Sequence, residues 1–370
     1  MKFSKRIPGE LRPNAISLLL EEKRRSGART LDLTESNPTR AGIRYPAGFL
    51  GALADERAVR YEPEPFGLPF AREVVAHEFN APFERVALAA STSELYSWLF
   101  KLLCDPGDEV LTPRPSYPLF EHLAALESVA IRHYGLFYDY GWFIDVQSLR
   151  EAITPRTRAV IVVNPNNPTG NFVRASEWAQ LMEICAERGL AIISDEVFGD
   201  YRLDELSEVA AEAQCPLFLL NGLSKTVGLP QMKLAWMIAE GPQIETAIER
   251  LEIIADTYLS VGTPVQCAVE SLLKLRGPVQ GQIRTRLREN LATIVDTPLR
   301  TLKVDAGWYV IVALPPPLAE EETAERLLRE SNVLVQPGYF YDFERAGYLV
   351  LSLLTPPAVF REGVSALVSL

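Results

Sequence analysis

The sequence predicts an α/β fold in which a mostly parallel central sheet carries helices on both faces, with a smaller α+β domain beside it. Strand patterns such as Ala159–Val163 and Leu190–Ile193 are apolar at every position, which is typical of strands buried on both faces. Amphipathic helical patterns separate such strands along the chain, and this alternation builds parallel sheets. Because ligands bind these sheets at the carboxyl ends of the strands, functional residues are expected there.

The elements follow from apolar periodicity and from the turn residues that interrupt it. In the first two thirds of the chain the expected order is helix 68–79, strand 86–90, helix 92–104, strand 109–112, helix 116–127, strand 129–135, strand 158–163, helix 175–188, strand 190–194 and strand 216–221. Residues 241–296 are expected to be mainly helical, followed by strands 308–313 and 348–353 and helices near 318–330 and 358–368. This change of pattern predicts an N-terminal arm (1–35) packed with the small domain, a large domain (36–260) whose strand ends are expected to bind a ligand, and a small C-terminal domain (261–370).

The composition indicates a soluble globular protein and argues against some functions. The net charge of -11 disfavours binding to nucleic acid or to an anionic membrane, because both need a cationic face. The four cysteines are widely spaced and suggest neither disulfides nor a metal site, which is consistent with a reducing cytoplasm. No signal-peptide pattern or membrane-spanning apolar run is evident, so a cytoplasmic location is expected.

Lys225 follows the apolar strand pattern of residues 215–221, which places its amine at the strand-end edge of the sheet. Burial there would lower the pKa of the amine and favour its attack on a carbonyl, as in a Schiff base with an aldehyde cofactor. The alternative is an ordinary solvated lysine in a loop. The reactive role therefore needs support from the residues at the other strand ends.

Asn167 and Asp195 follow two other buried strands. The turn Asn164–Gly170 would present the amide of Asn167 to the strand-end cleft. Asp195 could pair with a protonated ring nitrogen and so keep a pyridinium cationic. The alternatives are a purely structural turn and a helix N-cap.

Three hydroxyl residues and one aromatic residue stand at further strand ends. Ser91, Thr92 and Ser93 precede a helix, whose N-terminus would bind phosphate unless they serve only as caps. Tyr117 could stack on a flat heterocycle or pack on the surface. No metal ligation is expected from the histidines, which show no ligand spacing: His77, His122 and His133.

In their order and spacing these segments resemble the class I/II aminotransferases, which are pyridoxal-phosphate-dependent enzymes of fold type I. The matching segments are Ser91–Glu94, Pro115–Pro118, Asn164–Gly170, Asp195–Glu196 and Ser224–Lys225. Flanking segments are similar as well, so the likeness covers roughly residues 30–368.

The resemblance implies a role for each matching residue. Lys225 would form the Schiff base with pyridoxal 5′-phosphate and then shuttle a proton between substrate and cofactor. Asp195 would hold the pyridine nitrogen, Asn167 would contact the 3′ oxygen, and Tyr117 would stack on the ring. The implied phosphate ligands are Ser91, Thr92, Ser93, Ser224 and, from the neighbouring subunit of a homodimer with shared active sites, Tyr61.

Three positions depart from the family pattern. Lys233 stands where an arginine usually clamps the phosphate, and a lysine is a less directional ligand. Phe198 replaces a tyrosine, so the cofactor's 3′ oxygen loses one donor. Val350 stands where an arginine usually grips the substrate's α-carboxylate. Either another residue takes this role, or the substrate is not a standard α-amino acid; the candidate residues are Asn37, Arg40, Arg44 and Arg345.

We therefore expect an aminotransferase with ping-pong kinetics, in which a small-molecule amino donor loads the cofactor and a keto acceptor removes the amine. A lyase or decarboxylase of the same fold remains possible, because Lys225 and Asp195 would serve those reactions equally. A noncatalytic binding protein that kept the cofactor fold is the second alternative. The sequence does not identify the substrate.

Overall fold

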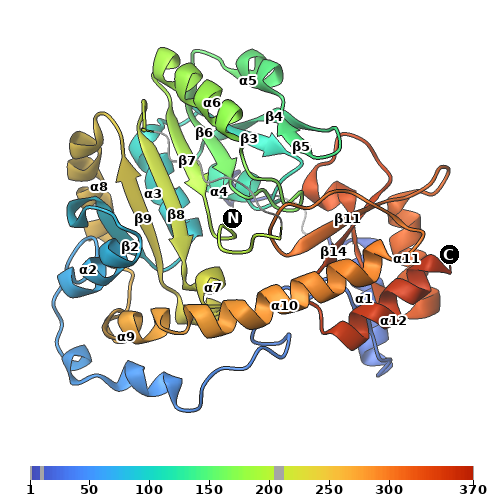
Figure 1. Cartoon of the computed structure of the whole chain (residues 1–370). Coiled ribbons are helices and arrows are strands. Elements are labelled where there is room, and N and C mark those ends of the chain that lie inside the picture. The colour runs from blue at the N-terminus through green and yellow to red at the C-terminus, as the bar shows by residue number, and fades with distance from the viewer. Residues whose placement is uncertain (1, 9–11, 204–211, 370) are drawn as a thin grey trace.

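The computed structural model describes residues 2–8, 12–203 and 212–369, and its largest element is an eight-stranded sheet with the order β2-β9-β8-β7-β6-β3-β4-β5 (Figure 1). The strands are β2 (Val86–Ala89), β3 (Glu109–Arg114), β4 (Ala130–Tyr138), β5 (Trp142–Ile144), β6 (Thr157–Val163), β7 (Ala191–Asp195), β8 (Leu217–Gly222) and β9 (Ala235–Glu240). From β4 through β8 in this order the neighbours are parallel, whereas β5 and β9 are antiparallel to theirs. The parallel strands therefore all end at the same edge.

Helices cover both faces of this sheet because successive strand residues point to opposite sides. These helices are α2 (Pro69–Glu78), α3 (Thr92–Leu103), α4 (Phe120–Leu126), α5 (Val146–Ala152), α6 (Ala175–Arg188), α8 (Ile244–Tyr258) and α9 (Thr263–Leu273). Ile161 and Ile193 share a core with α3, α4 and α8 on one face. Val160 and Ile192 pack with α5 and α6 on the other, and Trp236 packs with α2 and α9.

The C-terminal part forms a second sheet with the order β10-β11-β14-β13 (Figure 1). Its elements are β10 (Arg300–Thr301), β11 (Tyr309–Ala313), β13 (Gln336–Pro337), β14 (Tyr348–Ser352), α11 (Glu320–Ser331) and α12 (Pro357–Val368). The long helix α10 (Arg276–Val295) extends from the side of the large sheet to the second sheet and contacts α12 (Figure 1).

The segments of α1 and β1, near the start of the chain, lie against this C-terminal part. Helix α1 (Ala15–Arg25) contacts α11, and β1 (Leu31–Asp32) pairs in parallel with β12 (Val333–Leu334). The boundary expected after residue 260 falls just before α9, which packs with α2 on the large sheet. The division into domains 36–260 and 261–370 stays a prediction.

The predicted α/β fold is confirmed, with differences at single elements. The helix expected from residue 116 begins only at Phe120, because Pro118 has no backbone N–H and holds the preceding residue extended. Two short elements, β5 and α5, and the antiparallel strand β9 were not expected. Gly228 and Pro230 precede the apolar run of β9 and Gly241 follows it, but the sequence analysis assigned no element to this run.

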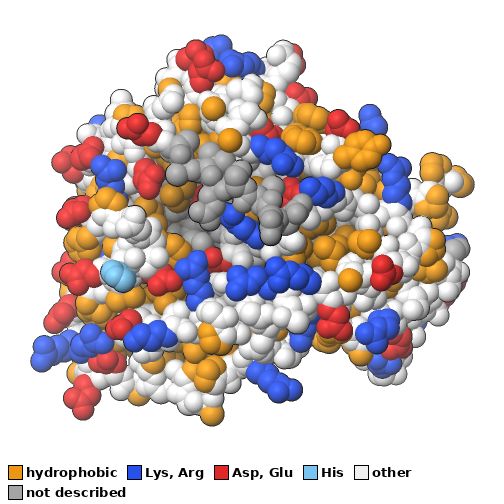
Figure 2. Space-filling model, viewed as in Figure 1, with side chains coloured by type: hydrophobic (Ala, Val, Ile, Leu, Met, Phe, Trp, Pro, Cys, Tyr) orange, Lys and Arg blue, Asp and Glu red, His pale blue; other side chains and the backbone are white. Residues whose placement is uncertain are grey.

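On the face shown in Figure 2, several Lys and Arg side chains form a row, while other cationic side chains and the acidic ones are scattered over the rest of the face. The row of Lys and Arg side chains crosses this face where α10 lies in Figure 1. In the part of the chain that the structure describes, no helix is both long and apolar enough to cross a membrane.

Gly170 should be essential for the turn after β6. Its φ is +72°, and a Cβ there would overlap the backbone oxygen of Ala306. We expect Gly170→Ala to lower the free energy of unfolding by about 3 kcal/mol, from roughly 1 kcal/mol of left-handed strain and roughly 2 of overpacking.

Gly189→Ala is the matched control, because Gly189 has φ +64° and a Cβ there would meet no atom of the described residues within 4 Å. Only the backbone penalty of about 1 kcal/mol applies at this position. Urea unfolding measures both variants, and equal losses would show that the contact with Ala306 is unimportant.

Candidate active site

A cavity of about 350 Å³ lies at the carboxyl ends of the parallel strands. Most of the residues singled out in the sequence line it together: Ser91, Thr92, Ser93, Tyr117, Asn167, Asp195, Phe198, Ser224, Lys225 and Lys233. They come from the segments that follow β2, β3, β6, β7 and β8. The parallel arrangement thus brings to one place residues that are far apart in the sequence.

Lys225 lies on the single-turn helix α7 (Leu223–Thr226), directly after β8. Its Nζ is 4.6 Å from the ring centroid of Trp308 and 5.3 Å from that of Phe198. The hydroxyl of Tyr201 donates to the backbone oxygen of Lys225 at 2.5 Å and fixes the turn. Burial lowers the pKa of Lys225 to about 8, although the negative charge of Asp195 opposes the shift. The amine is therefore much more easily deprotonated than a surface lysine.

Asp195 ends β7 with its carboxylate buried. Oδ2 accepts from the hydroxyl of Tyr96 at 3.1 Å, and Oδ1 accepts from the backbone N–H of Val197 at 3.3 Å. Burial raises the pKa of Asp195 to about 6, against the lowering effect of these two hydrogen bonds and of Lys225. The carboxylate is held in place by uncharged donors, so a cationic ligand group would stabilise its charged form.

Asn167 lies in a turn that is fixed from both sides. The neighbouring Asn166 donates through Nδ2 to the backbone oxygen of Pro115 at 3.0 Å and to Oγ1 of Thr169 at 2.7 Å, and it accepts from Ser116 at 3.2 Å. These bonds tie the turn after β6 to the loop after β3. The Oδ1 atom of Asn167 itself is buried and has no hydrogen-bond partner among the described residues. A buried polar atom of this kind is costly unless a ligand satisfies it.

The N-terminus of α3 forms another part of the wall. Ser91 is its N-cap and accepts from the backbone N–H of Glu94 at 3.2 Å, so the capping role considered for this serine is real. Glu94 in turn accepts from the backbone N–H of Ala90 and from Ser260, each at 2.7 Å. Hydroxyls and N–H groups at such a helix start attract anions, and the exposed Lys233 adds a positive charge to the same cavity.

The remaining predicted residues do not line this cavity. Tyr61 is 79% exposed and borders a separate small cavity. The side chain of Asn37 accepts from Thr39, and Arg40 forms an ion pair with Glu35 at 3.2 Å. Arg345 is exposed, as is Arg44, whose backbone N–H donates to Gln282. Val350 is buried on β14 between Ile311 and Gln336 of the adjacent strands.

Three polar residues of the site, Ser36, Tyr96 and Tyr309, were missed by the sequence analysis. Ser36 and Tyr309 line the cavity. Tyr96 bonds Asp195 from the buried face of α3. Nothing in its sequence context distinguishes Tyr96 from a core aromatic at helical spacing, whereas Ser36 stands beside the Asn37–Pro38 turn and could have been suspected.

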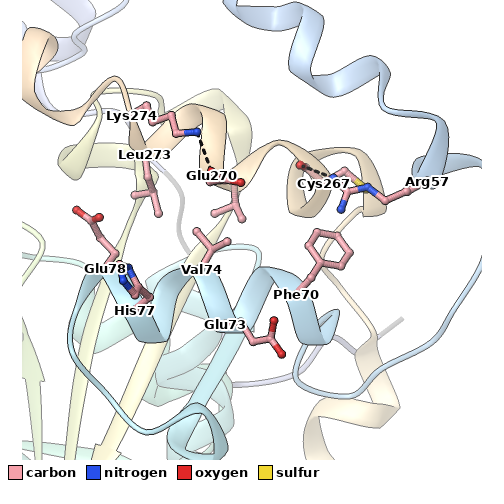
Figure 3. A pocket seen from close by; sticks show the side chains of 11 residues that line it. Arg57, Phe70, Glu73, Val74, His77, Glu78, Cys267, Glu270, Leu273 and Lys274 are labelled. Atoms are coloured by element: carbon pink, nitrogen blue, oxygen red, sulfur yellow. Dashed lines mark hydrogen bonds and ion pairs between the residues drawn. The ribbon is translucent and has the colours of Figure 1, made fainter.

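A more open depression of about 620 Å³ lies elsewhere, between α2 and α9 (Figure 3). Phe70 and Val74 on α2 face Cys267 and Leu273 on α9, and charged side chains surround them (Figure 3). No residue of the predicted site lines it. Cavity volume alone would have selected this depression as the candidate site, because the strand-end cavity is smaller.

The comparisons with known proteins show the class of enzyme, which is one that transfers amino groups. The family model for class I and II aminotransferases matches residues 40–367, and the chain belongs to this family. Members of the family generally depend on pyridoxal phosphate. The family, the fold and the enzyme class expected from the sequence are thereby confirmed, whereas the role of each site residue stays a prediction.

Relatives and solved structures show the same likeness. The chain is 30% identical over 270 residues to the glutamate-pyruvate aminotransferase AlaA of Escherichia coli strain K12, covering 69% of this chain and 67% of that protein. The alanine aminotransferase of Mycobacterium bovis is 31% identical over 251 residues, which cover 65% of this chain and 55% of that protein. An aminotransferase structure from Escherichia coli has a TM-score of 0.88 at 22% identity and covers 100% of this chain and 98% of its own. The structure of alanine aminotransferase from Pyrococcus furiosus has a TM-score of 0.86 at 23% identity. The match covers 96% of this chain and 95% of that one.

The raised pKa of Asp195 predicts a pH-dependent stability of the cofactor-free protein. Between the ordinary pKa of 3.8 and the folded value of about 6, the folded chain binds more protons than the unfolded chain. The protonated Asp195 therefore contributes its full share to the free energy of unfolding below pH 4. This contribution, about 3 kcal/mol in total, is lost as the pH rises through 6.

Asp195→Asn removes the titrating group but keeps the shape of the side chain. We expect its stability, relative to the wild type, to rise by about 3 kcal/mol between pH 4 and pH 7. Urea unfolding at several pH values in this range measures the difference. Parallel curves for the two proteins would mean that Asp195 titrates as an ordinary carboxylate.

Proposed function

We propose that the protein is a cytoplasmic pyridoxal-phosphate-dependent aminotransferase that moves an amino group from a small-molecule donor to a keto acceptor by a ping-pong mechanism. The main support is that Lys225, Asp195 and Asn167, which follow the adjacent parallel strands β8, β7 and β6, all line one cavity. When bound, the cofactor would supply an aldehyde that bonds to amines and a ring that withdraws electrons from the reacting carbon.

The residues of the cavity fit this cofactor. Its volume of about 350 Å³ suits a small-molecule site. The unpartnered amide oxygen of Asn167 marks a place for a polar substituent of the ring. The N-terminus of α3, together with Ser224 and Lys233, provides the donors and the positive charge that a phosphate needs. Tyr117 offers a ring that would stack on the heterocycle.

Lys225 and Asp195 would carry out the chemistry that the chain itself contributes. Lys225 would hold the cofactor's aldehyde carbon covalently and, once displaced by substrate, move the proton at the substrate's reacting carbon. Its pKa of about 8 keeps a usable share of neutral amine near neutral pH. Asp195, positioned by Tyr96, would pair with the protonated ring nitrogen and so keep the ring cationic.

A homodimer would complete the site. Apolar and aromatic side chains stand exposed on the segments around Tyr61 and at the end of α8: Leu50, Val59, Tyr61 and Tyr258. Tyr61 and Leu259, the residue after Tyr258, border the same small cavity, and exposed apolar residues that lie close together favour a protein contact. We assign Tyr61 to the phosphate of the neighbouring subunit, which would explain why it does not line the cavity of its own chain.

Absorbance of the cofactor-saturated protein tests the proposed function. We expect a panel of amino acids and primary amines to contain donors that convert the cofactor from its aldehyde form to its amine form, and a keto acceptor to reverse this. Lys225→Ala should slow the conversion about 10³-fold, because the proton-transferring group is lost. Lys274→Ala, which removes a surface lysine paired with Glu270, is the control and should have no effect.

Other outcomes would replace the proposal. Release of a carbonyl product or of CO₂ without the amine form would indicate a lyase or decarboxylase. A bound cofactor whose spectrum no donor alters would indicate a noncatalytic binding protein.

Lys233 tests the assignment of the phosphate end. Lys233→Met should weaken cofactor binding by roughly 10- to 100-fold, since a charge-assisted hydrogen bond contributes about 1.5–3 kcal/mol. Lys233→Arg should preserve or tighten binding, because a guanidinium can bind phosphate in a bidentate manner. Fluorescence titration of the apoprotein with pyridoxal phosphate measures both, and an unchanged affinity in Lys233→Met would exclude a contact with the phosphate.

A further inference from the structure

Three side chains that can bind a metal ion lie together where the large sheet meets the C-terminal part. They are Glu121 in the first turn of α4, His133 on β4 and Asp342, which directly follows the short helix Gly338–Tyr341. One ligand atom of each lies within 4.8 Å of the other two. Spacing along the chain predicted no metal ligation by His133, because three separate segments supply this cluster.

Contacts of its backbone hold Asp342 beside the large sheet. Nε of Arg114, at the end of β3, donates to the backbone oxygen of Asp342 at 2.9 Å. The backbone N–H of Ser116 donates to the oxygen of Tyr341 at 3.0 Å. Asp342 has a φ of +57° and caps the helix that it follows. The position of its carboxylate next to β3 and β4 is therefore fixed by the main chain up to the Cα atom.

A buried hydroxyl orients the imidazole of His133. Thr112 on β3 is the register partner of His133, and its Oγ1 lies 3.0 Å from Nδ1 of the ring. When Nδ1–H donates to this oxygen, Nε2 carries the lone pair that a metal ion binds. Metal-binding histidines commonly have such a partner for the second ring nitrogen, which fixes the orientation of the ring. Thr112 is only 1% exposed, so water does not compete for this bond.

The charges around His133 favour a metal ion over a proton. Burial lowers the pKa of His133, although the charge of Asp342 opposes this effect; Arg114 lowers the pKa further and Glu121 raises it. The imidazole is therefore neutral at neutral pH, which is the form that binds metals. Even with Arg114 included, the two carboxylates leave the group negatively charged, and a divalent ion between them would remove their mutual repulsion.

The set of ligands selects the ion. An imidazole with two carboxylates suits Zn²⁺, whereas Mg²⁺ and Ca²⁺ prefer oxygen ligands alone. With three protein ligands, Zn²⁺ completes its tetrahedron with a water molecule. Donor atoms around tetrahedral Zn²⁺ lie about 3.4 Å apart, so the three ligand atoms would have to approach by up to about 1.4 Å. Glu121 is exposed and can make most of this movement by a change of rotamer.

We propose that Glu121, His133 and Asp342 bind Zn²⁺, with Thr112 orienting the imidazole. The ion would join α4 and β4 of the large sheet to the segment after residues 338–341 of the C-terminal part. Phe120, next to Glu121, lines the strand-end cavity, so the ion would also hold one part of the cavity wall in place. The inference does not depend on the proposed reaction, and its failure would leave that function untouched.

Equilibrium binding of Zn²⁺ tests the site. Cofactor-loaded protein is freed of unbound cofactor, and its Zn²⁺ affinity is measured by competition with a chelating dye in the presence of excess Mg²⁺. We expect one Zn²⁺ per chain with a Kd of about 1 µM or below. His133→Gln, Glu121→Gln and Asp342→Asn should each weaken binding at least about 100-fold, since loss of an outer-shell partner already costs roughly 10- to 100-fold. His77→Gln, which removes an exposed histidine of α2, is the control and should bind like the wild type.

Two substitutions of Thr112 distinguish a built site from binding to surface groups. Thr112→Val keeps the shape of the side chain and should weaken binding roughly 10- to 100-fold, whereas Thr112→Ser keeps the hydroxyl and should preserve the affinity. If the variants of buried residues do not fold, Glu121→Gln decides, because Glu121 is exposed. No binding up to about 1 mM Zn²⁺, or an affinity unchanged in Glu121→Gln, would overturn the inference. An affinity unchanged in Thr112→Val would overturn the assigned orientation of His133.

Discussion

The site depends on holding one amine and one carboxylate out of water at the same edge of a parallel sheet. Burial moves the pKa of Asp195 up to about 6 and that of Lys225 down to about 8, and each charge opposes the shift of the other. Two neighbouring strands, β7 and β8, fix this arrangement through their backbone pairing. Because both pKa values approach neutrality, small changes of environment, such as a cationic ring beside Asp195, decide which group is charged.

The second sheet is attached to this edge by the backbone, which explains how it can form the far wall of the cavity. Ala306 donates to the oxygen of Gly170 at 2.8 Å, and Gly307 donates to that of Tyr201 at 2.9 Å. Ser116 donates to the oxygen of Tyr341 at 3.0 Å. Each bond joins a loop at the strand ends to the C-terminal part. The position of the second sheet relative to Lys225 is therefore set by main-chain geometry and not by flexible side chains alone.

The sequence was sufficient for the features that depend on local pattern. Continuous apolar strands and amphipathic helices predicted the sheet, and residues such as Asp195 and Lys225 were predicted at its edge because they directly follow strands. Contacts between distant segments were not predictable. Tyr96 is indistinguishable in sequence from a core residue, and only the packing of α3 on the sheet brings it to Asp195. Likewise, strand register alone reveals that Val350 shares a face with Tyr309.

The central claim is that Lys225 is the group that bonds the cofactor. Borohydride reduction of the protein saturated with pyridoxal phosphate, followed by peptide mapping, tests it most directly. The account predicts a stable phosphopyridoxyl group on the peptide that contains Lys225. An unmodified Lys225, or a label confined to another lysine such as Lys233, would contradict it.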